Sequence, residues 1–110
     1  MHLVTAAQAV PYDPPGHHDV AARRLQGLDA GGPGGFSVGL SHYPPGSTVD
    51  SAPTAAETVY VVLSGELELT CDDRVVTLGR HDSVHLTKGE VRSLRNASGA
   101  DATLLVVLRP

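Results

Sequence analysis

Short runs of Val, Leu and Thr, divided by turn residues, dominate the second half of this 110-residue chain. A strand is predicted about every eight to ten residues, a spacing typical of an antiparallel sandwich or barrel. The predicted strands of this half are residues 58–63, 66–70, 74–78, 83–86, 91–95 and 102–108. Gly, Asp or Asn residues stand between consecutive strands, where tight turns require them. The pattern predicts an all-β fold.

The first half is less regular. Residues 36–43 alternate large and small side chains and are predicted as a strand, which residues 44–46 (Pro-Pro-Gly) terminate. Residues 21–28 are predicted as a strand, although Ala-Ala-Arg-Arg-Leu is also compatible with a helical turn. Three prolines within residues 11–15 exclude a helix or a central strand there. We therefore predict a Pro-rich arm over residues 1–20 and one domain over residues 21–110.

Composition excludes several classes of protein. The net charge is −4 and the few basic residues are scattered, so no basic face for nucleic acid is expected. No apolar run reaches the roughly 18 residues of a membrane helix, and the N-terminus does not resemble a signal peptide. The single cysteine, Cys71, permits no internal disulfide, which favours a reducing, cytoplasmic location. The preference for Arg over Lys, with abundant Ala and Gly, is associated with bacterial genomes of high GC content. With no Trp and one Phe, Val and Leu must build the interior and leave room within it.

Two segments resemble the conserved motifs of the cupin superfamily. Pro45-Gly46 together with Glu57–Leu67 is similar to the first motif, and Asp82–Asn96 is similar to the second. The resemblance extends over residues 36–108. It implies a small antiparallel jelly-roll β-barrel with a pocket inside, in agreement with the strand spacing.

The resemblance also implies where a metal would bind. Metal-binding cupins present two His and a Glu from the first motif and one His from the second. In this chain the two His positions carry Ala52 and Thr54, the Glu position carries Thr58 with Glu57 one residue early, and the last His position carries Arg92. Ala has no donor atom, a Thr hydroxyl is a weak ligand and Arg is a permanent cation. We therefore expect no metal at the usual position, and no cofactor.

The cupin register directs Arg92 and Tyr60 into the barrel. A guanidinium in a low dielectric needs a partner, and a substrate carboxylate or phenolate would provide one. There are two alternatives to a substrate anion as the partner of Arg92. Arg92 could form a salt bridge with Glu57 or an aspartate, or the strand register could place it outside the barrel. Tyr60 would supply a hydroxyl as donor or general acid beside Arg92. Simple packing of Tyr60 is its alternative role.

Histidine is frequent, with six residues in the chain. We predict His17 as a catalytic candidate, because a stiff arm over residues 12–17 could close the pocket of its own barrel or of a partner's. His42, with Tyr43, could line the mouth of the pocket. The alternation of Val84 and Leu86 predicts that His85 faces outward. A surface or interface role for each histidine, and a relocated metal site formed from His42, His81 or His85, stay open.

A further set of inward positions would contact the substrate. These are predicted to be Thr54, Thr58, Val62, Val84, Leu86 and Leu94. Cys71 lies beside Asp72 and Asp73, whose negative charges raise a thiol pKa, so it is a poor nucleophile.

Three functions are compatible with these residues. The first is a metal-independent enzyme, a cyclase, isomerase or decarboxylase, that acts on a small anionic or aromatic, polyketide-like molecule. The second is a non-catalytic binding or accessory protein. The third is a metal-dependent dioxygenase or lyase with relocated histidines. We also expect a homodimer, because a barrel this small has open sheet edges, with His85 and the arm as interface candidates.

Overall fold

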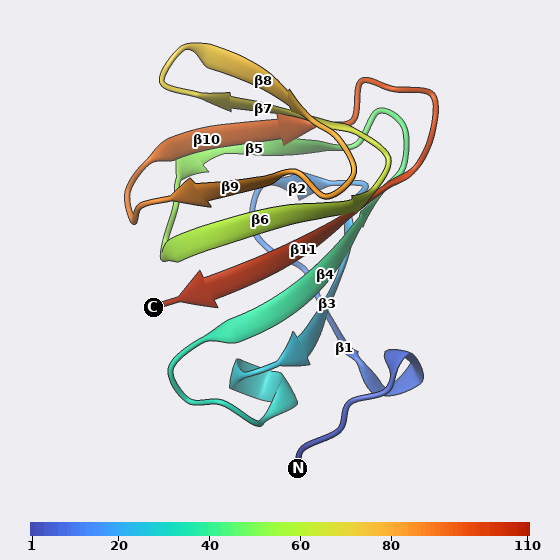
Figure 1. Cartoon of the computed structure of the whole chain (residues 1–110), viewed down its shortest axis with the longest axis vertical. Helices are drawn as coiled ribbons and strands as arrows, with labels where there is room; N and C mark the ends of the chain where they lie inside the picture. Colours follow the sequence, from blue (N-terminus) through green and yellow to red (C-terminus); the bar gives the residue numbers. More distant parts are fainter.

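Two antiparallel β-sheets face each other in the computed structural model, which describes residues 1–110 (Figure 1). The strands are β1 (Val10–Tyr12), β2 (His17–His18), β3 (Ala21–Gln26), β4 (Ser37–Tyr43), β5 (Thr48–Pro53), β6 (Glu57–Ser64), β7 (Leu67–Cys71), β8 (Arg74–Leu78), β9 (Ser83–Leu86), β10 (Val91–Arg95) and β11 (Ala102–Arg109). One sheet has the order β1-β3-β4-β11-β6-β9 and the other β2-β5-β10-β7-β8. The predicted jelly-roll β-barrel is confirmed. The helical segments are two 3₁₀ turns, η1 (Ala6–Gln8) and η2 (Leu28–Ala30), and neither they nor any other helix could span a membrane.

Three strands were not predicted from the sequence: the short strands β1 and β2, which lie in the arm, and β5. β5 lies beside β10 and completes the wall of the second sheet, with Arg92 opposite Ala52 and Leu94 opposite Val49. Its sequence, Thr-Val-Asp-Ser-Ala-Pro, has no alternation of apolar and polar residues, and most of its side chains are not buried. Pairing with β10 rather than local propensity therefore makes it a strand.

The N-terminal segment contributes an edge strand to each sheet. β1 pairs with β3 at the edge of the six-stranded sheet, where Pro11 lies opposite Arg23. β2 pairs with β5 at the edge of the five-stranded sheet, where His17 lies opposite Val49. Proline cannot donate to a ladder, so an edge is the position in a sheet that tolerates it. Residues 13–16 thus connect the two sheets on one side of the barrel (Figure 1).

The barrel interior is tightly packed over part of its volume. Eleven buried hydrophobic residues form a single cluster there: Tyr43, Val49, Tyr60, Val62, Leu67, Leu69, Leu78, Leu86, Leu94, Ala102 and Leu104. Val62, Ala102 and Leu104 have no exposed surface. Alternation within β6 places Thr58, Tyr60 and Val62 inward, as the cupin register predicts.

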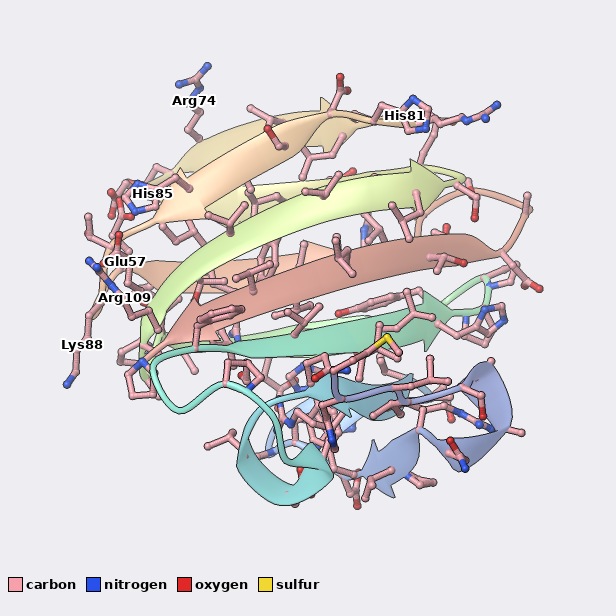
Figure 2. All side chains as sticks on the ribbon, turned by 60° about the horizontal axis from the view of Figure 1, so that its bottom comes forward. Glu57, Arg74, His81, His85, Lys88 and Arg109 are labelled. Atoms are coloured by element: carbon pink, nitrogen blue, oxygen red, sulfur yellow. The ribbon has the colours of Figure 1, made fainter.

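The outer face of β6 carries a small network of charges at one edge of the barrel (Figure 2). The Glu57 carboxylate accepts a hydrogen bond from Nε of Arg109 at 3.2 Å, and Nε2 of His85 lies 3.1 Å from the other oxygen. These bonds, first from Arg109 and then from His85, hold the pKa of Glu57 below its usual value. His85 lies outside the barrel, as the alternation of β9 predicts. Glu57 therefore does not replace the Glu of the first motif.

Asn96 fixes the connection after β10. Its side chain is 1 % exposed, and its Nδ2 donates to the carbonyl oxygens of Tyr43 and Ala100, both at 2.8 Å. Its Oδ1 accepts hydrogen bonds from the backbone nitrogen and the hydroxyl of Ser98. All the polar atoms of the side chain are thus satisfied in a buried position.

We expect Asn96→Ala to lower the free energy of unfolding by about 1–3 kcal/mol, because it removes the side-chain donor to the buried carbonyl oxygen of Tyr43, whereas the Ala100 carbonyl keeps its hydrogen bond from the Ser98 hydroxyl. Urea denaturation followed by circular dichroism measures the change. Ser51→Ala at an exposed position of β5 is the control and should change the stability by less than about 0.5 kcal/mol. An equally small effect of Asn96→Ala would contradict this account of the connection.

Candidate functional site

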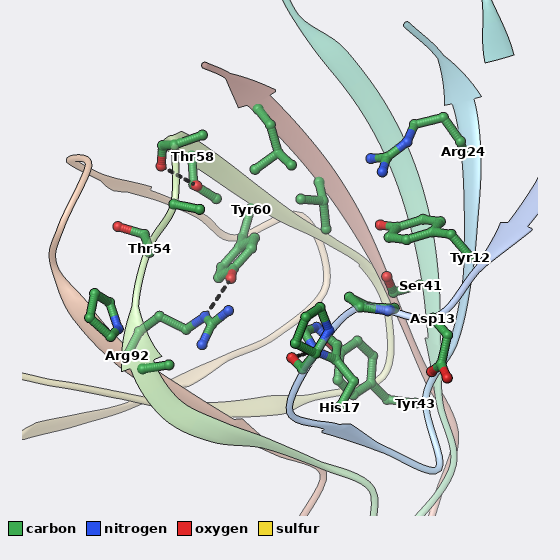
Figure 3. A pocket seen from close by; sticks show the side chains of 18 residues that line it. Tyr12, Asp13, His17, Arg24, Ser41, Tyr43, Thr54, Thr58, Tyr60 and Arg92 are labelled. Atoms are coloured by element: carbon green, nitrogen blue, oxygen red, sulfur yellow. Dashed lines mark hydrogen bonds between the residues drawn. The ribbon is translucent and has the colours of Figure 1, made fainter. Parts of the chain in front are cut away.

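A cavity of about 500 Å³ opens between the two sheets, and residues 12–15 and His17 border it (Figure 3). The arm therefore lines the pocket of its own barrel. All four positions at which the cupin resemblance places metal ligands lie on the cavity wall: Ala52, Thr54, Thr58 and Arg92. The cavity thus lies where the cupin motifs place a metal site, but its wall carries a different set of side chains.

These side chains do not fit a metal ion. The hydroxyl of Thr54 donates to the carbonyl oxygen of Thr87 at 2.8 Å and accepts from the nitrogen of Gly89 at 3.0 Å. The hydroxyl of Thr58 donates to the carbonyl oxygen of Ala56 at 2.8 Å. Both hydroxyls are committed to the backbone, and the remaining positions offer a methyl group and a guanidinium cation. The donor set of a metal-binding cupin is absent from this wall.

Arg92 projects into the cavity from β10 and contacts Tyr60 on β6 (Figure 3). Its Nε donates to the Tyr60 hydroxyl oxygen at 3.0 Å, and its Nη1 donates to the carbonyl oxygen of Asp50 at 3.2 Å. Arg92 forms no salt bridge with a carboxylate of the chain, so neither alternative considered for it is observed. Since Tyr60 accepts from Arg92, its own O–H proton remains available to a ligand.

His17 provides a proton acceptor in the same cavity. Its Nδ1 lies 3.0 Å from the carbonyl oxygen of Pro15, which can only accept a hydrogen bond. The proton must therefore be on Nδ1, and Nε2 carries the free lone pair. Burial lowers the pKa of His17 below the ordinary 6.5, and the positive charge of Arg92 adds to this effect. The imidazole is consequently neutral at neutral pH.

Tyr43 differs from Tyr60 although both line the cavity. Its side chain is 1 % exposed, and burial together with the nearby Tyr60 raises its pKa far above the ordinary value of a tyrosine. Tyr43 is therefore a weaker acid than an ordinary tyrosine, and its role in the cavity is packing. A guanidinium contacts the hydroxyl of Tyr60 but not that of Tyr43.

Several predicted site residues lie elsewhere. His42 is exposed, and its Nε2 is 3.4 Å from a carboxylate oxygen of Asp101, because neighbouring residues on β4 point to opposite faces and Tyr43 takes the inward position. Val62 and Leu94 are buried in the core, away from the cavity lining. Val84 and Leu86 line a separate hollow of about 460 Å³ between β8 and β9.

The separate hollow includes the one group of three potential metal ligands in the chain, Cys71, Asp72 and Glu90. Burial, followed by the charges of Asp72 and Glu90, raises the pKa of the Cys71 thiol, in agreement with its predicted inertness. His42, His81 and His85 do not come together into such a group. A relocated histidine site is therefore not formed in the structure.

Several lining residues were not predicted from the sequence, among them Arg24, Ser41, Val106 and Leu108. Arg24 lies on β3, where Ala22 and Arg24 point inward while Ala21 and Arg23 are exposed. The ambiguity between a strand and a helical turn over residues 21–28 concealed this alternation. The sequence signal for Arg24 was its place in the alternation of β3, which directs the arginine toward the interior of the barrel.

The family model described as Cupin domain matches residues 39–108. A curated protein of Mycobacterium tuberculosis, named a β-D-galactosidase, is 53% identical over 108 residues, which cover 98% of this chain and 93% of that protein. The polyketide cyclase RemF from Streptomyces resistomycificus aligns with a TM-score of 0.85 at 20% identity, over 99% of this chain and 79% of that one. A predicted oxalate decarboxylase from Thermotoga maritima aligns with a TM-score of 0.78 at 20% identity, over 97% of both chains. The similarity to these two structures is a similarity of fold.

Proposed function

The chain belongs to the cupin family, and from this premise we propose that it is a metal-independent glycosidase that hydrolyses β-D-galactosides in the cavity bordered by residues 12–17. The substrate class comes from the 53% identical relative, whose similarity extends over 98% of the chain. The observation that carries the chemistry is the hydrogen bond between Arg92 and Tyr60 in the same cavity as a neutral His17.

Most glycosidases use two carboxyl groups on either side of the bond that they cleave. Asp13 is the only acidic residue that lines this cavity, and it is exposed. A pair of carboxyl groups is therefore not available at this wall. Among the lining groups that can exchange protons, Tyr60 is hydrogen-bonded to Arg92 and His17 has a free Nε2, so we assign them the acid and base roles.

The proposed step is a displacement by water. Nε2 of His17 accepts a proton from water, and the water oxygen forms a bond to the anomeric carbon. The bond between that carbon and the leaving oxygen breaks, and the leaving oxygen takes the proton of the Tyr60 hydroxyl. Arg92 stabilises the phenolate that remains. The proton held by His17 returns to Tyr60 through solvent, which restores the resting state and leaves a net hydrolysis.

The pH dependence of kcat/KM should show the protonation of His17. Protonation of Nε2 removes the base, so we expect kcat/KM to fall as the pH decreases through the pKa of His17, with a midpoint below 6.5. His42→Gln, an exposed position outside the cavity, should leave this midpoint unchanged. A profile that is flat down to pH 5, or a midpoint that moves in His42→Gln, would contradict the role of His17.

A panel of nitrophenyl glycosides tests the substrate class. We expect release of nitrophenol from the β-D-galactoside and at least about tenfold slower release from the β-D-glucoside, whose C4 hydroxyl has the opposite configuration. His17→Gln should lower the galactoside rate about 100-fold or more. No release above the uncatalysed rate from any member of the panel would overturn the proposal.

A second candidate is proton transfer on a small anionic or aromatic carbonyl compound, as in a cyclase, isomerase or decarboxylase. The observation in its favour is that Arg92 contacts a hydroxyl and a carbonyl but no carboxylate, so it could hold an enolate or acid. Inactivity on the glycoside panel combined with tight binding of aromatic acids would favour this candidate. The homodimer and the cytoplasmic location stay predictions.

A further inference from the structure

Arg24 is a buried cation with unused hydrogen-bond donors at the wall of the cavity. The residue is 8 % exposed, and neither its Nε nor its Nη1 has a hydrogen-bond partner. Its nearest carboxylate is that of Asp29, with Oδ1 3.4 Å from Nε and a side chain that is 52 % exposed. The two groups are within ion-pair distance, but they are not aligned for a hydrogen bond. Buried donors without partners are costly, and a bound anion is one kind of partner that would satisfy them.

The surroundings of Arg24 hold its guanidinium in place. The group stacks on the ring of Tyr12, with 4.0 Å between the guanidinium carbon and the ring centre. Gly39 lies opposite Arg24 in the β3–β4 ladder, so no side chain occupies the space beside it. A Cβ on Gly39 would be 3.1 Å from the Tyr12 hydroxyl and 3.9 Å from Nη1 of Arg24. Tyr12 and Gly39 therefore position the guanidinium but supply no hydrogen-bond acceptor for its Nε and Nη1.

Arg24 and Arg92 enter the cavity from different sheets, Arg24 from β3 and Arg92 from β10 (Figure 3). Both are cations, and the lining contributes one exposed carboxylate, from Asp13, against them. The interior is thus locally positive in a chain whose net charge is −4. A planar guanidinium binds an oxyanion through two parallel N–H bonds.

We propose that Arg24 forms an anion subsite of the cavity and that the substrate is a galactoside bearing a carboxylate or sulfate group. This inference rests on the proposed function, because it specifies the galactoside that Tyr60 and His17 would cleave. Arg24 binds the oxyanion of the sugar, while Tyr60 and His17 act at the anomeric carbon. Arg24 is a specificity residue in this arrangement and takes no part in proton transfer.

Equilibrium binding tests the subsite without requiring catalysis. We expect titration calorimetry to show that D-galacturonate or D-galactose 6-sulfate binds at least about tenfold more tightly than neutral D-galactose to the unaltered protein. The two acidic ligands separate the carboxylate from the sulfate as the preferred group, and preference for either supports the subsite. Equal affinity for all three sugars would overturn it, whether or not any variant folds.

Variants identify the residue responsible. Arg24→Met should abolish the preference for the acidic sugar. Arg24→Lys should retain part of it, because lysine keeps the positive charge but lacks the two parallel N–H donors of a guanidinium. Arg23→Met, an exposed neighbour on the same strand, should leave the preference intact. If Arg24→Met keeps the preference, or if Asp29→Asn removes it to the same extent, Arg24 serves the fold and the proposal is overturned.

The two proposals fail separately. Tight, Arg24-dependent binding of an acidic sugar without hydrolysis of any galactoside would overturn the glycosidase and retain the subsite. Hydrolysis of neutral and acidic nitrophenyl galactosides at equal kcat/KM, unchanged in Arg24→Met, would retain the glycosidase and overturn the subsite.

Discussion

Tyr60→Phe should lower kcat/KM for a nitrophenyl β-D-galactoside about 100-fold to 1000-fold, with little change in KM. The substitution removes one oxygen atom from a side chain that is 5 % exposed. That oxygen is the only one in the cavity that accepts a hydrogen bond from a guanidinium while keeping a proton to donate. Loss of a positioned general acid has an effect of this size. Steady-state kinetics with thermal unfolding as a check on folding measures it.

Tyr43→Phe is the matched control, because it removes the same atom from the wall of the same cavity. Burial raises the pKa of Tyr43, and Arg92 donates its hydrogen bond to Tyr60 rather than to Tyr43, so we expect a loss of less than about tenfold. Equal losses in Tyr43→Phe and Tyr60→Phe would show that packing, and not proton donation, explains both effects.

Arg92→Met should lower kcat/KM by about 100-fold, because the phenolate of Tyr60 loses the cation that stabilises it. The same change has a second, independent consequence. Burial is the main cause of the low pKa of His17, and the positive charge of Arg92 lowers it further. Removal of that charge raises the pKa of His17, so the acid limb of the pH profile should move to higher pH.

Arg95→Met controls for the loss of an arginine from β10. Arg95 is exposed, and its Nε lies 3.4 Å from a carboxylate oxygen of Glu68, so neither rate nor pH profile should change by more than about twofold. A reduced rate in Arg92→Met with an unmoved acid limb would contradict the proximity of Arg92 and His17 in the active form.

The fold was predictable because most strands carry their own signal. Thr58, Tyr60 and Val62 alternate with outward residues on β6, and turns such as that at Gly65, where φ is +73°, mark the strand ends. β5 was not predictable from its own sequence, since it has no apolar period and depends on β10 for its pairing. Register taken from the cupin motif nevertheless placed Thr54 and Arg92 on the cavity wall.

The site was only partly predictable, since it combines segments that are distant in the sequence. The inward position of Arg92 followed from the motif, but its hydrogen bonds to Tyr60 and to the carbonyl of Asp50 depend on how the two sheets face each other. His42 and Tyr43 were both considered for the mouth of the pocket, although adjacent strand residues cannot point to the same face. Arg24 could not be identified because its importance lies in two buried nitrogens, Nε and Nη1, that lack a hydrogen-bond partner, and a sequence does not show that.

Galactoside hydrolysis by metal-depleted protein is the measurement that tests the account most directly. The protein is treated with chelator, its metal content is determined by elemental analysis, and its rate on nitrophenyl β-D-galactoside is compared with that of untreated protein. We expect an unchanged rate with far less than one metal ion per chain, since Ala52, Thr54, Thr58 and Arg92 offer no ligand set. A rate that disappears with the metal and returns when a divalent ion is restored would contradict it.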